Sequence, residues 1–247
     1  MAFIALVWLS GPAFGQEYLE TAEASANAIS RIHALCPDAE RETEELDSRV
    51  KPRPVSGQVS RPALRENLLL MAKQDQEARA FLLAAGWPWP LDPHSPPVRW
   101  MNEVDSRNLK RLKHILNQDG FPTAEEVGYD GVDAAWLVSI HAARDPDLQE
   151  RVLALTIGHV QRGEVRGDQV AMLTDDLLAG RGKPQRYGTN FEMRDGELKP
   201  TPVEDEANID KLRRSVGLGS LKNYACVLRA MYGSADTQTQ SPAPAHK

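Results

Sequence analysis

The stretch at residues 130–149, DGVDAAWLVSIHAARDPDLQ, constrains the fold more than any other part of the sequence. Residues 132–143 contain neither Gly nor Pro, and their apolar side chains recur at intervals of three and four positions, which is typical of a helix. Few charged residues interrupt this run, so the helix is expected to be buried over most of its surface. Asp145 and Pro146 then predict the start of a second helix, because Asp favours the N-cap and Pro the first helical position. The sequence therefore predicts a sharp corner between two helices, with His141 one turn before it.

Periodicity of the same kind runs through most of the remaining chain, in segments that Gly or Pro residues close. One exception is the alternating pattern around Asp195-Gly196, a dipeptide suited to a tight turn, which predicts a β-hairpin over residues 184–203. The predicted fold class is mainly α, a single multi-helix domain with one small β-hairpin. The other predicted helices cover residues 17–35, 39–50, 63–85, 105–119, 146–162, 169–179, 205–216 and 220–232.

A segment rich in Pro, Gly and Ser at residues 52–62 divides the chain into two unequal parts. It predicts a linker, because such residues favour turns and extended chain over regular structure. The Ala- and Glu-rich residues 16–51 before it are predicted to form an N-terminal helical arm. Residues 63–232 after it form the predicted main domain. The polar, Pro-containing tail at residues 233–247 is predicted to be disordered.

The first 15 residues, MAFIALVWLSGPAFG, combine a short apolar run with small residues at its end. The order Ala13-Phe14-Gly15 matches the small-x-small pattern that signal peptidase cleaves. This predicts a signal peptide at residues 1–15; a buried N-terminal strand or helix is the alternative. The apolar run is too short to span a bilayer, so no transmembrane anchor is predicted. We therefore expect a bacterial protein that is periplasmic or secreted.

The chain has two cysteines, Cys36 and Cys226, near opposite ends of the part that remains after the signal peptide. In an oxidising compartment they would form a disulfide, and closing so long a loop is worth about 4–5 kcal/mol in the chain-entropy model. Two buried free thiols are the alternative. Export favours the disulfide, which is the prediction.

Charge and motif content argue against several functions. The net charge of −6 over 247 residues gives no electrostatic reason to expect binding to nucleic acid. The histidines and cysteines lack metal-ligand spacing, so neither a metal site nor a cofactor is predicted. The sequence also lacks the phosphate-loop, nucleophile-elbow and zinc-protease motifs. The expected partner is an unknown small molecule or a component of the cell envelope.

The predicted hairpin carries a polar face. Gln185, Tyr187 and Thr189 alternate along its first strand and would project from the same side. An amide, a phenol and a hydroxyl suit ligand binding better than core packing. If that strand lies over the helix that carries His141, the four side chains share one polar cleft. Three further charged residues are candidates for orienting or ligand-binding groups: Asp75, Arg79 and Asp175.

Two functions fit these residues. In the first, the protein is an exported module that binds a ligand or partner in the envelope. In the second, it is a hydrolase or lyase with His141 as general base, Tyr187 as acid or positioning group, and Gln185 orienting the substrate. A structural interpretation is also open: His141 is a core histidine, Asp105 and Asp205 cap helices, and the polar set is a buried hydrogen-bond network.

The polar and small residues of the main domain occur in a recognisable order. They are Met71, Asp75-Gln76, Arg79, Asp105, Asn108, Gly120, Pro122, Ala135-Trp136-Leu137, His141-Ala142, Gln149, Gly163-Glu164, Gln185, Tyr187-Gly188-Thr189, Glu204-Asp205, Arg214 and Gly217-Leu218. In this order the chain resembles an uncharacterised bacterial family, a domain of unknown function. Two positions depart from the family's pattern: Asp176 stands where Arg is expected after Asp175, and Asn190 stands where Gln is usual. The resemblance implies a fold and a set of polar positions, but it implies no reaction.

Overall fold

The computed structural model describes residues 16–49, 58–85, 91–195 and 197–232. Within these ranges the protein is mainly α-helical, with one two-stranded antiparallel sheet, so the predicted fold class is confirmed. The predicted signal peptide and the predicted disordered tail lie outside the described residues, as does most of the predicted linker. In chain order the elements are α1 (Gln16–Leu35), α2 (Pro37–Arg49), α3 (Pro62–Ala84), α4 (Pro96–Asp119), α5 (Ala124–Ile140), α6 (Pro146–Gln161), α7 (Gly167–Gly180), β1 (Phe191–Arg194), β2 (Glu197–Pro200), a 3-10 turn (Glu206–Asn208), α8 (Ile209–Ser215) and α9 (Leu221–Tyr232).

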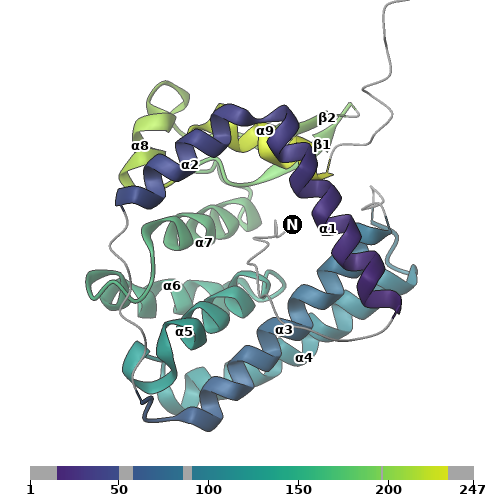
Figure 1. Ribbon diagram of the computed structural model, residues 1–247. Helices are drawn as coiled ribbons and strands as arrows, with labels where there is room; N and C mark the ends of the chain where they lie inside the picture. Colours follow the sequence, from purple (N-terminus) through teal and green to yellow (C-terminus); the bar gives the residue numbers. More distant parts are fainter. Residues whose placement is uncertain (1–15, 50–57, 86–90, 196, 233–247) are drawn as a thin grey trace, which may run out of the picture.

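Helix α5 lies at the centre of the larger hydrophobic core (Figure 1). Val132 and all of residues 134–140 are buried, which confirms the predicted buried helix. Helices α3 and α4 pack on one side of α5, and α6 and α7 pack on the other. A helix enclosed in this way needs apolar side chains around its whole circumference, as its sequence provides.

The predicted corner between two helices is present at the end of α5. His141 is the C-cap residue of α5, and α6 begins at Pro146. Asp145 is the N-cap of α6, and its carboxylate accepts a hydrogen bond from the Leu148 backbone N–H at 3.0 Å. This cap fixes the direction in which α6 leaves, so His141 lies at a rigid junction.

A smaller core joins the hairpin to α9 and to the end of α3. Strands β1 and β2 pair with Arg194 opposite Glu197, and Asp195 has a positive φ of 55°, as a tight hairpin turn requires. The predicted hairpin is therefore confirmed. Its apolar side packs against α9, and Leu83 of α3 belongs to the same cluster. The buried members are Leu83, Phe191, Leu198, Ala225, Leu228 and Tyr232.

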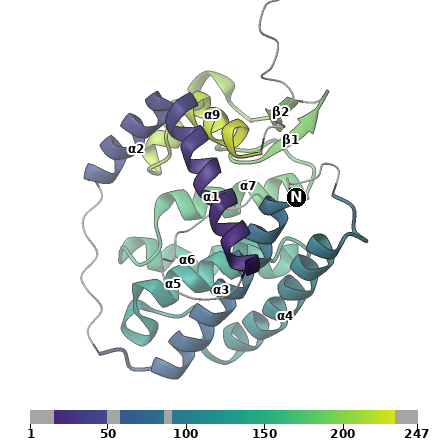
Figure 2. The same ribbon diagram turned by 45° about the vertical axis from the view of Figure 1, so that its right-hand side comes forward.

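The N-terminal arm, α1 and α2, packs across the main domain instead of standing apart from it. Helix α1 contacts both α3 and α9, which it crosses in both views (Figures 1 and 2). Cys36, between α1 and α2, forms a disulfide with Cys226 of α9, with their Cα atoms 5.9 Å apart. The predicted disulfide is confirmed.

The arm also supplies hydrogen bonds at both ends of α9. Near its start, the Glu42 carboxylate accepts from the Ser220 backbone N–H at 2.8 Å and from the Asn223 side chain at 2.7 Å. At its end, Arg31 Nε donates to the Ala230 carbonyl at 2.7 Å. A carboxylate at the N-terminus and a guanidinium at the C-terminus satisfy open backbone groups and match the helix dipole. Residues of α1 and α2 therefore provide hydrogen bonds to backbone groups at both ends of α9.

One predicted helix boundary is wrong. Helix α4 begins at Pro96, well before the predicted start at residue 105. Proline is tolerated in the first turn of a helix, where its missing N–H is not needed. Asp105 consequently lies inside the helix and does not cap it, whereas Asp205 caps the 3-10 turn as predicted.

None of the helices in the described part of the chain is long and apolar enough to cross a lipid bilayer.

Candidate functional site

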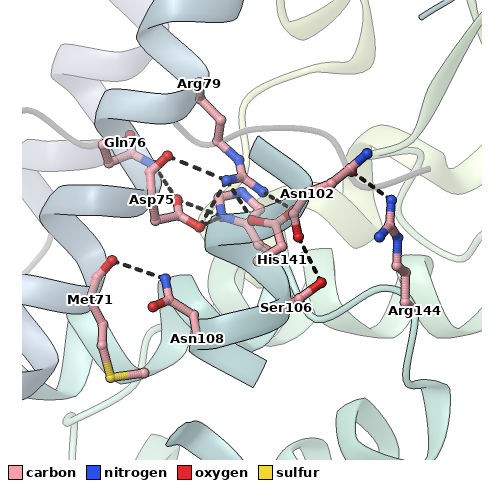
Figure 3. Close-up of polar contacts among 10 residues, drawn as sticks. Met71, Asp75, Gln76, Arg79, Asn102, Ser106, Asn108, His141 and Arg144 are labelled. Atoms are coloured by element: carbon pink, nitrogen blue, oxygen red, sulfur yellow. Dashed lines mark hydrogen bonds and ion pairs between the residues drawn. The ribbon is translucent and has the colours of Figure 1, made fainter. Parts of the chain in front are cut away.

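Four charged or titratable side chains meet where α3, α4 and α5 come together, and we call them the His141 network (Figure 3). His141 Nδ1 lies 2.8 Å from each carboxylate oxygen of Asp75. Arg79 Nη1 donates to Asp75 Oδ1 at 2.9 Å and to Asp105 Oδ1 at 3.0 Å, and its Nη2 donates to Asp105 Oδ2 at 3.2 Å. The side chains of His141, Asp75 and Arg79 are 1–4% exposed, so the network is buried.

Each helix contributes to the network for a local reason. Asp75 and Arg79 are four residues apart on α3, so they lie one turn apart on the same face. His141 is brought to them by the end of α5, which packs along α3. Asp105 comes from the inner face of α4, where the neighbouring Asn108 donates to the Met71 carbonyl at 3.1 Å. The network therefore ties three helices together.

The two carboxylates of the network respond differently to their surroundings. Burial by itself would raise the pKa of Asp75, but the charge and hydrogen bond of His141 and the charge of Arg79 lower it below its ordinary value. Burial raises the pKa of Asp105, although Arg79 opposes the change. Two carboxylates and one guanidinium leave one net negative charge when the His141 imidazole is neutral. Protonation of His141 would balance the network.

Four atoms in this region are buried without a hydrogen-bond partner among the described residues: His141 Nε2, Arg79 Nε, Gln76 Oε1 and Asn108 Oδ1. Because the Asp75 carboxylate can only accept, His141 Nδ1 must carry the proton between them. His141 Nε2 is then a bare acceptor in the neutral ring and a donor in the protonated ring. A buried polar atom without a partner costs about 1–3 kcal/mol, so such atoms call for a ligand, ordered water or a functional role.

A second polar network surrounds Asp175, in the segment that precedes the hairpin. The Asp175 carboxylate accepts hydrogen bonds from the backbone N–H groups of Arg186, Tyr187 and Thr189 at 2.8–3.0 Å. It also accepts one from the Thr189 hydroxyl at 2.9 Å. Residues 185–190 thus form a loop around one carboxylate, which we call the Asp175 loop, and Gly188 at φ +67° permits its curvature.

The predicted strand through Gln185, Tyr187 and Thr189 is therefore wrong, because β1 begins only at Phe191. Alternation of polar residues indicates a strand only where the backbone is extended, and here the buried carboxylate of Asp175 bends it. Gln185 closes the loop: its amide accepts from the Asn190 N–H at 2.5 Å and donates to the Asn190 carbonyl at 2.9 Å.

The structure divides the candidate residues between the two networks. His141, Asp75 and Arg79 form the first, whereas Asp175, Gln185 and Thr189 belong to the second. Tyr187 contributes its backbone to the Asp175 loop, and its half-buried ring lies beside Arg186, 5.8 Å from the guanidinium carbon. No hydrogen bond described for the chain joins the two networks. The shared cleft of His141, Gln185 and Tyr187 stays a prediction.

Sequence reasoning did not single out two charged residues of these networks as candidates. Asp105 completes the His141 network, and its place in the residue order shared with the family was the available signal. Arg213 is fully buried beneath the Asp175 loop, donates to the Tyr187 carbonyl at 2.6 Å and lies over the Tyr224 ring at 4.8 Å. Nothing in the spacing of Arg213 distinguishes it from the surface arginines near it.

A comparison of the sequence with protein families finds a match that covers the part of the chain that contains both polar networks. A family model described as "Family of unknown function (DUF6624)" matches residues 62–236. The match begins at the start of α3 and continues past the end of α9, so it includes both polar networks and leaves out α1 and α2. It confirms the resemblance indicated by the order of polar residues. No curated protein and no solved structure matches the chain.

Proposed function

The chain belongs to the DUF6624 family of unknown function, and we propose that it is an exported protein that binds a small polar ligand at the His141 network. The observation that carries this proposal is the group of buried polar atoms without a partner at this network, which includes His141 Nε2, Arg79 Nε and Gln76 Oε1. A ligand that pairs with them would recover the free energy lost by their burial.

The Asp175 loop provides an internal comparison. There, four donors saturate one buried carboxylate, as expected of a network whose role is to hold a fold together. The Asp75 carboxylate of the His141 network is as deeply buried as Asp175, but it is held by side chains instead of backbone N–H groups. Unpartnered buried atoms occur beside both networks, since Asn190 Nδ2 and Arg213 Nη2 also lack a partner, so the case for binding rests on His141 Nε2, which can accept or donate.

The free atoms also restrict the chemistry of the ligand. Arg79 Nε can only donate, Gln76 Oε1 can only accept, and His141 Nε2 can do either. The ligand therefore needs both an acceptor and a donor, as a hydroxyl, amide or amino sugar has. When the His141 imidazole is neutral the network carries one net negative charge, which disfavours a phosphate or a free carboxylate as the ligand. His141 Nε2 is buried, so binding requires a neighbouring segment to move.

Export rests on a separate observation. The disulfide joins Cys36 to Cys226, and structural disulfides persist in oxidising compartments such as the periplasm. The small-x-small pattern at the end of the predicted signal peptide agrees with it. Periplasmic or secreted localisation is part of the proposal.

The hydrolase or lyase remains a second candidate, because of the geometry of His141 and Asp75. A carboxylate that holds Nδ1–H leaves Nε2 as the basic nitrogen, the arrangement that activates nucleophiles in many hydrolases. Among the described contacts, neither Gln185 nor Tyr187 reaches His141, so Arg79 is the nearer candidate to orient a substrate. Turnover of chromogenic esters or glycosides by the wild type, lost in His141→Gln, would favour this candidate.

Binding is tested by thermal denaturation in the presence of neutral envelope metabolites, such as N-acetylated amino sugars and amino acid amides. We expect at least one of them to raise the melting temperature of the wild type. The His141→Gln variant should remain folded and lose that shift. Tyr187→Phe is the matched control and should keep it, because no hydrogen bond described for Tyr187 uses its hydroxyl. A shift that survives in His141→Gln would rule out binding at this network.

A further inference from the structure

Helix α6 exposes apolar side chains to solvent. Six large apolar side chains are exposed in the described part of the chain, and three of them, Leu155, Ile157 and Val160, lie on α6. Ile157 is the most exposed of the six, at 60%. Ala154 is exposed beside them and Gly158 is half-buried, and we call these five residues the α6 face. Single exposed apolar residues are common, but a group of them on one helix is typical of an interaction surface.

The sequence of α6 contains no charged residue that could solvate this face. Residues 152–160, VLALTIGHV, include no Asp, Glu, Lys or Arg. His159, the one titratable residue among them, is buried. The exposed side of α4, by contrast, carries Glu103, Arg107 and Lys110. A helix at the surface ordinarily has charged residues on its outer side, so the α6 face is suited to being covered.

Charges of opposite sign lie at the two ends of the α6 face. Glu150 is near the start of α6, and Arg162 is its C-cap residue. The Arg162 guanidinium lies along the helix, since its Nη1 atom is 3.3 Å from the position that a Cβ atom at Gly158 would occupy. Within the chain Glu150 pairs with Arg181, and Arg162 pairs with Glu164. The side chains of Glu150 and Arg162 nevertheless remain 56% and 51% exposed, so each can reach a second partner.

We propose that the α6 face binds the α6 face of a second copy of this chain, with the two helices antiparallel. A two-fold axis at the level of Thr156, midway in sequence between Glu150 and Arg162, would bring Glu150 of each copy opposite Arg162 of the other. The apolar side chains between them would cover one another, as a two-fold interface requires of a single patch. Antiparallel helix dipoles favour the same arrangement. This surface is separate from the His141 network, and the proposal does not depend on the function proposed there.

A second copy fits the α6 face better than a lipid surface does. Helices that bind anionic membranes carry several Lys or Arg residues beside their apolar side chains, and residues 152–160 carry none. A face that is apolar in the middle, acidic at one end and basic at the other is complementary to itself. Ala154 and Gly158 are small, which permits the two helix axes to approach closely. Because a single helix pair makes a small interface, we expect a dissociation constant of about micromolar or weaker.

Sedimentation equilibrium of the disulfide-bonded protein at increasing concentration tests the dimer. We expect the average mass to rise from that of one chain towards that of two. Ile157→Asp should weaken association at least tenfold, because it places an unpaired carboxylate in the interface from both copies. Leu70→Asp is the matched control and should associate as the wild type does, since Leu70 is 47% exposed on α3, on the other side of α5. Thermal denaturation shows that both variants are folded.

Charge reversal tests the antiparallel arrangement. Glu150→Arg alone would place two guanidinium groups opposite each other at both ends of the interface, and Arg162→Glu alone would place two carboxylates there. Each variant should therefore associate severalfold more weakly than the wild type. In a mixture of the two variants, a dimer of one chain of each kind has opposite charges at both ends, so association should recover. The ion pairs within each chain cannot explain this recovery, because mixing leaves them unchanged.

Three results would overturn the dimer. The first is the mass of a single chain at every concentration, and the second is equal association of the wild type and Ile157→Asp. The third is a mixture of the charge-reversed variants that associates no better than either alone. A wild type that stays monomeric but pellets with anionic lipid vesicles, and an Ile157→Asp variant that does not, would assign the face to lipid instead. Failure of neutral metabolites to bind at the His141 network would leave association unchanged, so the two proposals fail separately.

Discussion

Replacing both Cys36 and Cys226 with serine is expected to lower the free energy of unfolding by about 4–5 kcal/mol. The two cysteines are 190 residues apart in sequence. The disulfide therefore restricts most of the unfolded chain, and the chain-entropy model assigns the largest stabilisation to such long loops. The native contacts of the arm remain possible without the disulfide, so the variant should still fold at low temperature.

Urea denaturation of the wild type, the double serine variant and the wild type in reducing agent provides the measurement. The reduced wild type is the control for the substitution itself, because it lacks the bond but keeps both sulfur atoms. We expect the two forms that lack the bond to unfold together at lower urea than the oxidised wild type. A difference below about 1 kcal/mol would contradict the chain-entropy argument.

The shape of the same transition reports how the arm and the main domain are coupled. The family match begins at residue 62, so α1 and α2 lie outside it. Nevertheless, Glu42 and Arg31 of the arm bind the two ends of α9, which lies within it. Because α9 also carries the apolar side chains that cover the hairpin, loss of the arm should loosen the hairpin. A single cooperative transition in the oxidised protein is the expected result.

The parts of the fold that could be predicted from sequence are those that depend on neighbouring residues. The corner after His141 followed from Asp145 and Pro146, whose cap and first-turn preferences act over a few residues. The hairpin followed from Asp195-Gly196, whose preference for positive φ is equally local. The disulfide followed from a count of two cysteines combined with the predicted signal peptide.

The parts that could not be predicted depend on distant residues. Nothing around Gln185 indicates that the Asp175 carboxylate of the preceding helix would bend the next segment into a loop. Asp105 lies inside α4 because the helix begins at Pro96, and the residues around Asp105 do not indicate that earlier start. Asp75 and Arg79 are four positions apart within one predicted helix, which places them one turn apart, but their contacts with His141 and Asp105 form only when three helices pack together.

Arg79→Met is expected to lower the free energy of unfolding by about 3–5 kcal/mol at pH 8. Arg79 is the only guanidinium between Asp75 and Asp105 in the described contacts. Without it, two carboxylates lie close together and largely buried, and only His141 and the Gln76 amide remain as described side-chain partners of Asp75. Methionine fills similar volume, so the loss would come mainly from the uncompensated charge.

The pH dependence of this loss identifies its electrostatic origin. In the wild type the lowered pKa of Asp75 means that this carboxylate stabilises the fold above its unfolded value, and that stabilisation is lost as the pH falls through the folded pKa. In Arg79→Met the pKa of both Asp75 and Asp105 should rise, so ionised Asp75 would contribute less stability and ionised Asp105 would cost more. The difference in the free energy of unfolding between the two proteins should therefore grow from pH 4.5 to pH 8 in urea denaturation.

Arg79→Met with Asp105→Asn removes one of the two charges and should recover part of the loss at pH 8. A loss that is the same at every pH would mean that packing, and not charge, holds the three helices together here.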